Sequence, residues 1–389
     1  MKKLLFISLI IINNVSAQNF PKFGVDSLLE IATWNVEWFG DTANGPSNEV
    51  NQFNNVVKLI KSADIDIWSL EEVSDNQTYL NMMTQLTGYS SSISTFNQTQ
   101  KMAIIWKNTL FDKLKEEHIL SSYYNDFAGR PPLMTTLRYK KGDLDTIYVI
   151  SLHMKANTGT TSQKQDAYQR RKNAANFLQL YIESVLKNKK YIVLGDWNDK
   201  LDVSIFDGVS ESPYKTLLDA NYFFPSKILA DKGRKTYYTG SVIDHILLGD
   251  SLAKFYIEGS INVFDNANTF LSGFSSSTSD HYPVFSSYKF FNSKVSITDT
   301  SKSAEAELET SKFKFYPNPC SNKIWAKNPF NNNLKIELYS LSGLVILTEN
   351  LFSLEEKTID ISNLDHGIYI LKTYTEDGLT DYKRLIKVE

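Results

Sequence analysis

The sequence of 389 residues predicts an α/β fold, in which helices flank a sandwich of two β-sheets, followed by a small C-terminal all-β sandwich. The first observation is that many strand patterns and a few amphipathic helix patterns alternate from about residue 28 to residue 291. The second is that residues 292–312 are rich in Ser, Thr, Lys and Glu, which is typical of a solvated linker. The third is that residues 313–389 contain short strand patterns separated by Gly, Asn and Pro.

The first 17 residues have the pattern of a secretory signal peptide. Lys2 and Lys3 precede an apolar run at residues 4–12, and "VSAQ" offers small side chains before a cleavage point at Gln18. The run is about half of the ~20 residues that a membrane span needs. No later stretch is apolar enough to cross a bilayer, so we expect an exported protein without a stable membrane span.

Charge and cysteine content exclude several classes of protein. The formal net charge is −3 and the isoelectric point is near 6.0, so no global positive field attracts nucleic acid or acidic membranes. Any such binding must therefore rest on a local patch. Cys320 is the only cysteine, which excludes an intramolecular disulfide and a cysteine-based zinc site.

The first elements of the α/β part are strands at residues 28–36 and 64–73, each followed by a helix. The strand patterns are rich in apolar and β-branched residues. The helix at residues 49–63 is expected to bury one face, formed by Val50, Phe53, Val57 and Ile60. The second helix is expected to turn three apolar residues inward: Leu80, Met83 and Leu86.

The remaining elements of this part are mostly strands. One long amphipathic helix is predicted at residues 163–188. The further strand candidates are residues 102–107, 135–139, 145–154, 190–196, 242–249 and 283–291.

Acids, amides and histidines gather where these strands begin or end. The clearest case is "GDWND" (residues 195–199), in which Asp196, Asn198 and Asp199 crowd the end of one strand. Similar groups occur at the other strand ends: Asn35, Glu37, Glu71, Glu72, His153, Asp244, His245, Asp280 and His281. In layered α/β folds the crevice at strand ends binds ligands. Oxygen-rich clusters suit Mg²⁺, Mn²⁺ or Ca²⁺, and a cation would offset the mutual repulsion of the acids.

Six short segments, in order, resemble the endonuclease/exonuclease/phosphatase superfamily, whose fold is that of pancreatic deoxyribonuclease. They are "TWNVEWF", "WSLEEV", "SLHMK", "GDWND", "IDHI" and "SDHYPV", and they extend the resemblance over roughly residues 28–291. The resemblance implies a metal-dependent phosphodiesterase domain at residues 18–291, with Mg²⁺ or else Mn²⁺ or Ca²⁺ as its cofactor.

The resemblance also implies roles for individual residues. The metal ligands would be Glu72, Asn35, Glu37 and Asp280. The phosphate-binding residues would be Arg130, Asn198 and Asn35. The catalytic residues would be His281, Asp244, Asp196, His153 and Asn198. Chemically, a divalent ion activates water, histidine carries protons near neutral pH, and Asn or Arg binds phosphate oxygens.

Two positions depart from the family pattern. The residue before the metal glutamate is Glu71 instead of Gln, and because adjacent strand residues face opposite ways, Glu71 is the alternative ligand. The glutamate that often pairs with a histidine like His153 has Gln100 as its nearest counterpart, which puts the proton-carrying role of His153 in doubt.

Three further groups of residues have open or structural interpretations. Arg170, Arg171 and Lys172 form either an exposed helix face or part of a phosphate-binding rim. Four tryptophans in strand patterns are expected to lie in the core: Trp34, Trp38, Trp68 and Trp106. His118 and His366 are expected to be surface or packing residues.

Residues 313–389 resemble the type A sorting domain of the type IX secretion system. "YPNP", "LYSLSG", "IDISNLDHGIYILK" and the basic ending "KRLIKVE" carry the resemblance. It implies an immunoglobulin-like sandwich that the secretion machinery recognises at the outer membrane. The cargo would then be secreted or attached to the cell surface.

The expected function is that of a secreted, nonspecific endonuclease acting on extracellular nucleic acid, DNA first and otherwise RNA. One alternative is a sphingomyelinase-like phospholipid phosphodiesterase, for which "NYFFP" (residues 221–225) is a candidate membrane-facing cluster, or a phosphatase. The other alternative is a non-catalytic surface adhesin. The sequence leaves the oligomeric state open.

Overall fold

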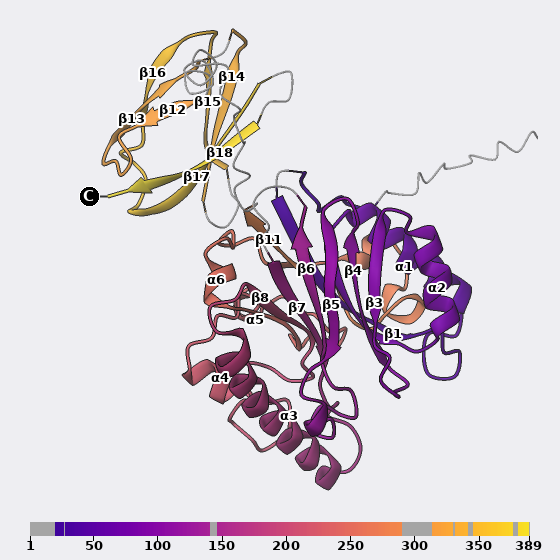
Figure 1. The fold of residues 1–389 in the computed structure, drawn as a ribbon. Coiled ribbons are helices and arrows are strands. Elements are labelled where there is room, and N and C mark those ends of the chain that lie inside the picture. Colours follow the sequence, from indigo (N-terminus) through magenta and orange to yellow (C-terminus); the bar gives the residue numbers. More distant parts are fainter. Residues whose placement is uncertain are drawn as a thin grey trace, which may run out of the picture. The chain divides into compact units, whose positions relative to one another are not determined.

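The chain divides into two compact units, which we call the N-terminal unit (Met1–Lys294) and the C-terminal unit (Val295–Glu389). A computed structural model describes residues 20–26, 28–140, 146–289, 313–329, 331–340, 345–375 and 380–388 (Figure 1). The predicted signal peptide and the predicted linker lie outside these residues. Within the described residues, no helix is both long and apolar enough to cross a membrane.

The first sheet of the N-terminal unit has six strands in the order β10-β11-β1-β2-β4-β3. Its strands are β1 (Leu28–Phe39), β2 (Ile67–Val73), β3 (Tyr89–Ile93), β4 (Lys101–Lys107), β10 (Asn262–Val263) and β11 (Val284–Lys289). β1 and β2 run parallel, whereas β11 runs antiparallel to β1. The C-terminal ends of β1 and β2 and the N-terminal end of β11 therefore lie at the same end of the sheet.

The second sheet has five strands in the order β5-β6-β7-β8-β9. Its strands are β5 (Phe111–His118), β6 (Leu133–Tyr139), β7 (Thr146–His153), β8 (Tyr191–Asp196) and β9 (Asp244–Leu248). β7 and β8 are parallel and β9 is antiparallel to β8, so His153, Asp196 and Asp244 meet in neighbouring register positions. This arrangement brings together residues from three distant parts of the sequence.

The two sheets pack against each other, and the longer helices cover their outer faces (Figure 1). α1 (Glu49–Ala63) and α2 (Asn76–Gln85) cover the first sheet, and α3 (Thr161–Tyr181) covers the second. α3 begins with a capping box between Thr160 and Gln163 and continues into a π-helical turn, Ile182–Leu186. The shorter elements lie in loops: η1 (Ser121–Tyr123), α4 (Lys215–Asp219), α5 (Lys227–Asp231), α6 (Asp250–Ala253), η3 (Ala267–Thr269) and α7 (Phe274–Ser277).

The predicted buried faces of α1 and α2 are partly wrong. Val50 is 69% exposed and Leu80 is 54% exposed, whereas Gln52, Tyr79 and Met82 are buried. Gln52 faces inward because its amide donates to the carbonyls of Val36, Glu37 and Thr278, which are backbone acceptors that hydropathy patterns do not reveal. These bonds tie α1 to the end of β1.

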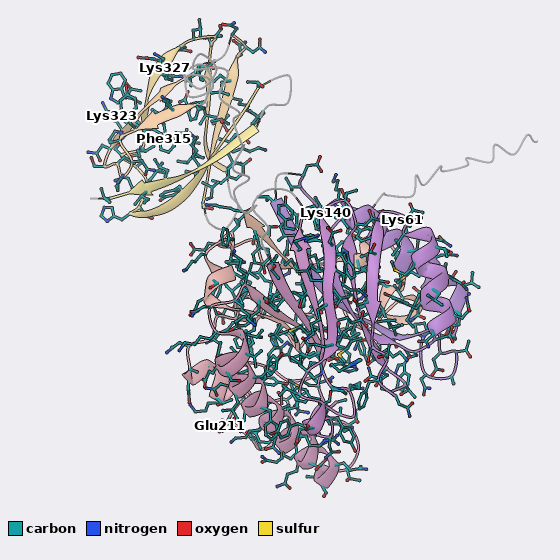
Figure 2. The ribbon with its side chains drawn as sticks, in the orientation of Figure 1. Lys61, Lys140, Glu211, Phe315, Lys323 and Lys327 are labelled. Carbon is teal, nitrogen blue, oxygen red and sulfur yellow. The ribbon has the colours of Figure 1, made fainter. Side chains whose placement is uncertain are left out.

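The C-terminal unit is a sandwich of a three-stranded and a four-stranded antiparallel sheet, as predicted. The first sheet has the order β12-β13-β16, and the second has the order β15-β14-β17-β18. Their bounds are β12 (Lys314–Tyr316), β13 (Lys323–Lys327), β14 (Leu334–Tyr339), β15 (Val345–Leu351), β16 (Glu356–Asp360), β17 (Gly367–Thr375) and β18 (Thr380–Lys387). Alternate residues of β13 face outward, including Lys323 and Lys327 (Figure 2), while Cys320 is buried in the core.

The structure confirms the predicted α/β sandwich, but the N-terminal unit contains three strands that the sequence patterns did not predict, β3, β5 and the two-residue β10. β5 is an edge strand whose exposed residues are Lys113, Leu114 and Lys115, and the partly exposed Glu116 and Glu117 follow them. Charged edge strands resist pairing with other chains, and for the same reason they lack the apolar alternation by which strands are predicted.

Candidate active site

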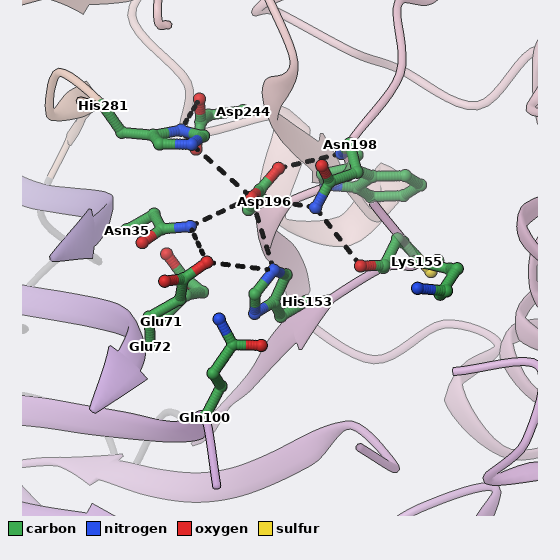
Figure 3. A network of polar contacts seen from close by, with 12 residues as sticks. Asn35, Glu71, Glu72, Gln100, His153, Lys155, Asp196, Asn198, Asp244 and His281 are labelled. Carbon is green, nitrogen blue, oxygen red and sulfur yellow. Dashed lines mark hydrogen bonds and ion pairs between the residues drawn. The ribbon is translucent and has the colours of Figure 1, made fainter. Parts of the chain in front are cut away.

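Strands of both sheets converge on a cleft of about 820 Å³ in the N-terminal unit. Figure 3 shows the polar residues that line it or lie directly behind it. Eight of the predicted site residues line the cleft: Glu37, Glu72, Arg130, His153, Asp196, Asn198, Asp280 and His281. The other two, Asn35 and Asp244, form hydrogen bonds to these residues. The structure therefore brings the complete predicted set together.

Asn35, near the end of β1, connects the two sheets. Its Oδ1 accepts a hydrogen bond from the backbone N–H of Glu37 (2.9 Å), which fixes the orientation of the amide. Its Nδ2 donates to Glu72 Oε1 and Asp196 Oδ2, both at 3.0 Å. Since the donor side of Asn35 faces the cleft, its orientation suits binding of a phosphate oxygen better than ligation of a metal.

Several residues of the cleft have left-handed backbone conformations. The φ angles are +48° at Glu37 and Trp38, +62° at Glu72 and +55° at Asn198. The pairing of β1 with β2 shifts register between Asn35 and Phe39, where the strand becomes irregular. Non-glycine residues seldom adopt this conformation, and such strain concentrates at functional sites. The left-handed conformations also interrupt the alternation of side chains between the two faces of the strand.

Glu71 and Glu72 face different surroundings. Glu71 is fully buried between the sheets, where its carboxylate accepts hydrogen bonds from the hydroxyls of Thr33 (3.0 Å), Ser69 (2.5 Å) and Ser151 (3.3 Å). Burial raises the pKa of Glu71 to about 8. Glu72 lines the cleft and accepts from Asn35 and from the backbone N–H of Trp38. Of the two, only Glu72 is placed to reach a ligand.

Asp196 lies at the centre of the cleft. Its Oδ1 accepts from the backbone N–H of Asn198 (2.8 Å), and its Oδ2 accepts from the Asn198 side chain (3.0 Å). Asp196 is 1% exposed, and burial raises its pKa to about 7, with Asp244 contributing and His281 opposing. A carboxylate with this pKa can accept a proton near neutral pH.

His281 is held by a carboxylate on one side and faces Asp196 on the other. Its Nδ1 lies 2.9 Å from Asp244 Oδ2, and its Nε2 lies 3.8 Å from Asp196 Oδ2. Burial disfavours the charged ring, but Asp244 and Asp196 outweigh it and raise the pKa of His281 well above its usual value. The Trp34 Nε1–H donates to the His281 carbonyl at 3.0 Å, which anchors the backbone at this position.

His153 has a different environment from His281. Its Nε2 lies 3.6 Å from Glu72 Oε1 and 3.5 Å from Asp196 Oδ2, and its buried Nδ1 has no hydrogen-bond partner among the described residues. Gln100, the predicted counterpart of a pairing glutamate, accepts instead from Arg130 Nη1. Burial lowers the pKa of His153 well below its usual value, and the charge of Arg130 lowers it further. His153 is therefore neutral at physiological pH.

Two groups of side chains have ligand atoms within 4.8 Å of one another and could hold a metal ion, namely Glu72 with His153 and Asp196, and Asp196 with Asp244 and His281. Glu37 and Asp280, which also line the cleft, belong to neither group among the described residues. Burial raises the pKa of Glu37 to about 8, with Asp280 and Glu72 contributing, and burial likewise raises the pKa of Asp280. In the described part of the chain, no lysine or arginine forms an ion pair with Glu37, Glu72 or Asp280. Carboxylate oxygens are hard ligands that fit Mg²⁺, Mn²⁺ or Ca²⁺, and a bound cation would favour the ionised form of these acids.

Asp199 lies outside this site, contrary to the expectation that a metal offsets both acids of "GDWND". Its Oδ2 pairs at 2.8 Å with Arg171, and both side chains are completely buried. Arg171 therefore belongs neither to an exposed face nor to a phosphate-binding rim, and it neutralises Asp199 directly. Of its helix neighbours, Arg170 lines the cleft and Lys172 pairs with Glu211 at 2.9 Å.

Two aromatic residues of the cleft were assigned wrongly or missed. Trp38 lines the cleft, whereas the other three strand tryptophans are buried as predicted. Tyr237, which the sequence did not single out, forms an isolated β-bridge with His281, and the two rings lie 4.9 Å apart. Tyr237 lies in a loop without a periodic pattern, so no sequence signal identified it.

Ser279 is a further residue that sequence reasoning missed. Its hydroxyl donates to the Asn35 carbonyl (2.6 Å) and accepts from the His281 backbone N–H (3.0 Å). It thereby fixes the loop before β11 against the end of β1. Its position directly before "DHYPV" was the available signal.

The "NYFFP" segment does not form an exposed aromatic cluster. Phe224 is 5% exposed and packs against Trp197 with ring centroids 5.3 Å apart. Phe223 is 40% exposed and packs against Tyr256. The segment thus contributes mainly to the core, which removes the feature that suggested a membrane-facing hairpin.

Comparisons with known proteins give two matches to protein families. The model of the endonuclease/exonuclease/phosphatase family matches residues 32–281. The model of a secretion system C-terminal sorting domain matches residues 314–388. No curated protein sequence matches the chain.

Solved structures with a similar fold cover the N-terminal unit. An AP endonuclease from Archaeoglobus fulgidus is 20% identical, with a TM-score of 0.50 over 67% of this chain and 99% of that chain. A 3′ phosphatase from Neisseria, bound to a product DNA hairpin, is 17% identical, with a TM-score of 0.47 over 67% and 99% of the two chains. The human Nocturnin catalytic domain is 15% identical, with a TM-score of 0.47 over 69% and 96%. At these identities the likeness concerns the fold alone.

Proposed function

Because the chain belongs to the endonuclease/exonuclease/phosphatase family, we propose that it is a divalent-metal-dependent phosphodiesterase, and more narrowly an exported nonspecific endonuclease. The observation that carries the proposal is the cleft in which the His281–Asp244 pair faces Asp196, with Glu72, Glu37 and Asp280 lining the same cleft. An adhesin with the same fold would have no need for such a combination of charges.

Glu72, Glu37 and Asp280 would hold the divalent ion, for which Mg²⁺ is the first candidate. When bound, the ion supplies Lewis acidity toward a phosphate oxygen. Asn35 Nδ2, whose two N–H groups donate to Glu72 and Asp196, would give up one of these bonds to donate to a phosphate oxygen of the substrate. Asn198 would contribute a second neutral donor from the other sheet.

Asp196 and His281 would move and stabilise charge during hydrolysis. Asp196, with a pKa near 7, accepts the proton of the attacking water. His281, held charged by Asp244, donates through Nε2 to the phosphate, whose negative charge increases in the transition state. His153 remains neutral and contributes a hydrogen bond to the phosphate or to the leaving oxygen, which differs from a proton-carrying role.

Arg130 would bind phosphate beside these groups. Its Nε and Nη2 donate to the carbonyls of His153 (3.2 Å) and Met154 (2.8 Å), which fixes the guanidinium at the cleft wall. Burial lowers its pKa to about 10, so the group stays charged at neutral pH. A positive charge without a carboxylate partner at this place favours an anionic substrate. Because it would contact phosphate and no base, it would not select a base sequence.

The C-terminal unit supports export of this activity. The sorting-domain match indicates passage across the outer membrane to the cell surface or the medium. We propose that the first 17 residues direct the earlier step and are then removed. Outside the cell, the substrate would be extracellular DNA or RNA.

The test is nicking of supercoiled plasmid DNA by the chain expressed from residue 18 onward, with Mg²⁺, with Mn²⁺ and with a chelator. The proposal expects nicking that requires metal and that falls to background in His281→Ala. Absence of cleavage by a folded protein with either metal would reject the deoxyribonuclease assignment. RNA, sphingomyelin vesicles and phosphomonoesters, tested next, would then distinguish ribonuclease, lipid phosphodiesterase, phosphatase and adhesin.

A further inference from the structure

The cleft is lined by acidic and by basic side chains. The acidic side chains, described above, are Glu37, Glu72, Asp196 and Asp280. The basic side chains are Arg130, Lys155 and Arg170, of which Lys155 follows β7 and Arg170 lies on α3. Figure 3 shows Lys155 on the same side of the network as His153 and Asn198.

Lys155 has no neutralising partner. In the part of the chain that the structure describes, its ammonium forms no hydrogen bond or ion pair, although it is partly buried at the wall of the cleft. Burial lowers the pKa of Lys155, and the charges of Arg170 and Arg130 lower it further. Three cations that repel one another are costly to hold together unless an anion binds between them.

The two arginines are also available to an anion. Arg130 is 8% exposed, and its hydrogen bonds go to two carbonyls and the Gln100 amide, none of which carries a charge. Arg170 donates to the Asn125 carbonyl, and its nearest carboxylate, Asp166, is 3.7 Å away and 64% exposed. The contacts orient both guanidinium groups, and among the described residues Arg130 has no carboxylate partner, whereas Arg170 has only the exposed Asp166.

We propose that Lys155 and Arg170, together with the edge of Arg130, form a second phosphate subsite next to the position of the scissile phosphate. This inference rests on the proposed phosphodiesterase function and narrows its substrate class. The preferred substrate would carry a further phosphate one nucleotide away from the bond that is cleaved, as an oligonucleotide does and a simple diester does not. Two bound phosphates would also fix the register of a strand without base contacts.

The test compares thymidine dinucleotides that differ only in a terminal phosphate: TpT, pTpT and TpTp. The protein is the chain expressed from residue 18 onward, with saturating Mn²⁺ or Mg²⁺. We expect kcat/KM for one of the two doubly phosphorylated dinucleotides to exceed that for TpT at least tenfold. The favoured isomer would show on which side of the scissile bond the subsite lies.

Lys155→Met and Arg170→Gln should each reduce this ratio toward one. Lys172→Met is the matched control, because Lys172 lies on α3 beside Arg170, does not line the cleft and pairs with Glu211, and it should keep the wild-type ratio. Circular dichroism and thermal unfolding would verify that each variant folds, and the wild-type ratio tests the inference independently of any variant.

Two negative results have different meanings. Hydrolysis of all three dinucleotides at equal rates by the wild-type chain would overturn the second subsite and leave the phosphodiesterase proposal intact. A failure to hydrolyse any of them, or plasmid DNA, would reject the phosphodiesterase itself.

Discussion

The Asp244 carboxylate hydrogen-bonds to Nδ1 of His281, the ring nitrogen opposite the one that faces Asp196, so its main effect on catalysis is expected to pass through His281. In Asp244→Asn the amide nitrogen can take the place of a carboxylate oxygen and leave His281 in the wrong tautomer. We expect kcat for diester hydrolysis to fall by about 10²–10⁴-fold with little change in KM.

Steady-state kinetics with a chromogenic phosphodiester would measure this effect. Asp250→Asn, which changes an exposed carboxylate outside the cleft, should behave as the wild type. An Asp244→Asn enzyme that keeps full kcat would exclude the proposed role of the pair.

The neighbouring glutamates allow a second comparison between single residues. Glu72→Gln removes a charged cleft ligand and should weaken Mn²⁺ binding by at least about 10–100-fold. Glu71→Gln should preserve Mn²⁺ affinity within a few-fold, because Glu71 lies between the sheets and its pKa of about 8 makes it already neutral at pH 7. Isothermal titration calorimetry would decide between them, and the reverse pattern would identify Glu71 as the ligand.

At the level of secondary-structure elements, β7 and β8 approach each other so closely at Gly195 that no side chain fits between them. Gly195, with φ of +148°, lies so close to β7 that an added Cβ would be 1.9 Å from the Leu152 carbonyl oxygen. Gly195→Ala must separate two strands that carry His153 and Asp196 at their ends. We expect a loss of at least about 3 kcal/mol in the free energy of unfolding.

Urea denaturation of Gly195→Ala would test this expectation, with Gly88→Ala measured alongside as the control variant. Gly88 has open space around it, and its change should shift the free energy of unfolding by less than about 1 kcal/mol. Equal stability of the two variants would mean that β7 and β8 can move apart without cost.

For the whole molecule, buried carboxyl groups determine how stability depends on pH. Burial raises the pKa of Glu30 to about 8 from an ordinary value of 4.5, with Asp66 contributing, and Glu37 and Glu71 are raised similarly. Unfolding releases these protons between pH 4.5 and 8. The stability that the groups contribute is therefore complete below pH 4.5 and is lost as pH rises through 8.

Glu30→Gln isolates one of these groups, because Glu30 lies near the start of β1, far along the strand from the cleft residues at its end. We expect the variant to equal the wild type near pH 5 and to exceed it at pH 9, by on the order of 1–3 kcal/mol. Urea midpoints at pH 5, 7 and 9 would measure the difference. A wild-type stability that increases from pH 7 to pH 9 would contradict the assignment.

Sequence reasoning anticipated which residues gather in the cleft, because acids, amides and histidines cluster at the predicted strand ends and because six motifs resemble one family. It identified Asp196, Asp244 and His281 as neighbours, although they are far apart in the chain. It preferred Glu72 to Glu71 as the metal ligand but kept Glu71 as an alternative, since the irregular end of β2 and the positive φ of Glu72 break the alternation from which the facing of side chains is predicted. It also missed the buried Arg171–Asp199 pair, because a charged residue on a helix gives no local signal of a partner from another element.

Fold prediction succeeded and failed for similar reasons. Buried strands such as β8 have continuous apolar patterns, whereas the exposed edge strand β5 does not. The buried face of α1 likewise differs from the predicted one, because it includes Gln52. The amide of Gln52 donates to backbone carbonyls of Val36 and Thr278, which only the folded chain brings together.

The position of the single cysteine has a practical and a biological consequence. Cys320 lies in the C-terminal unit and is only 2% exposed, and the sequence has no other thiol. Activity in the N-terminal unit should therefore not respond to the redox potential of its surroundings, and reductants such as dithiothreitol should not affect it. A cysteine introduced at the rim of the cleft, for example at Thr158, would be the only thiol in that unit, and a fluorophore attached to it would report directly on substrate binding.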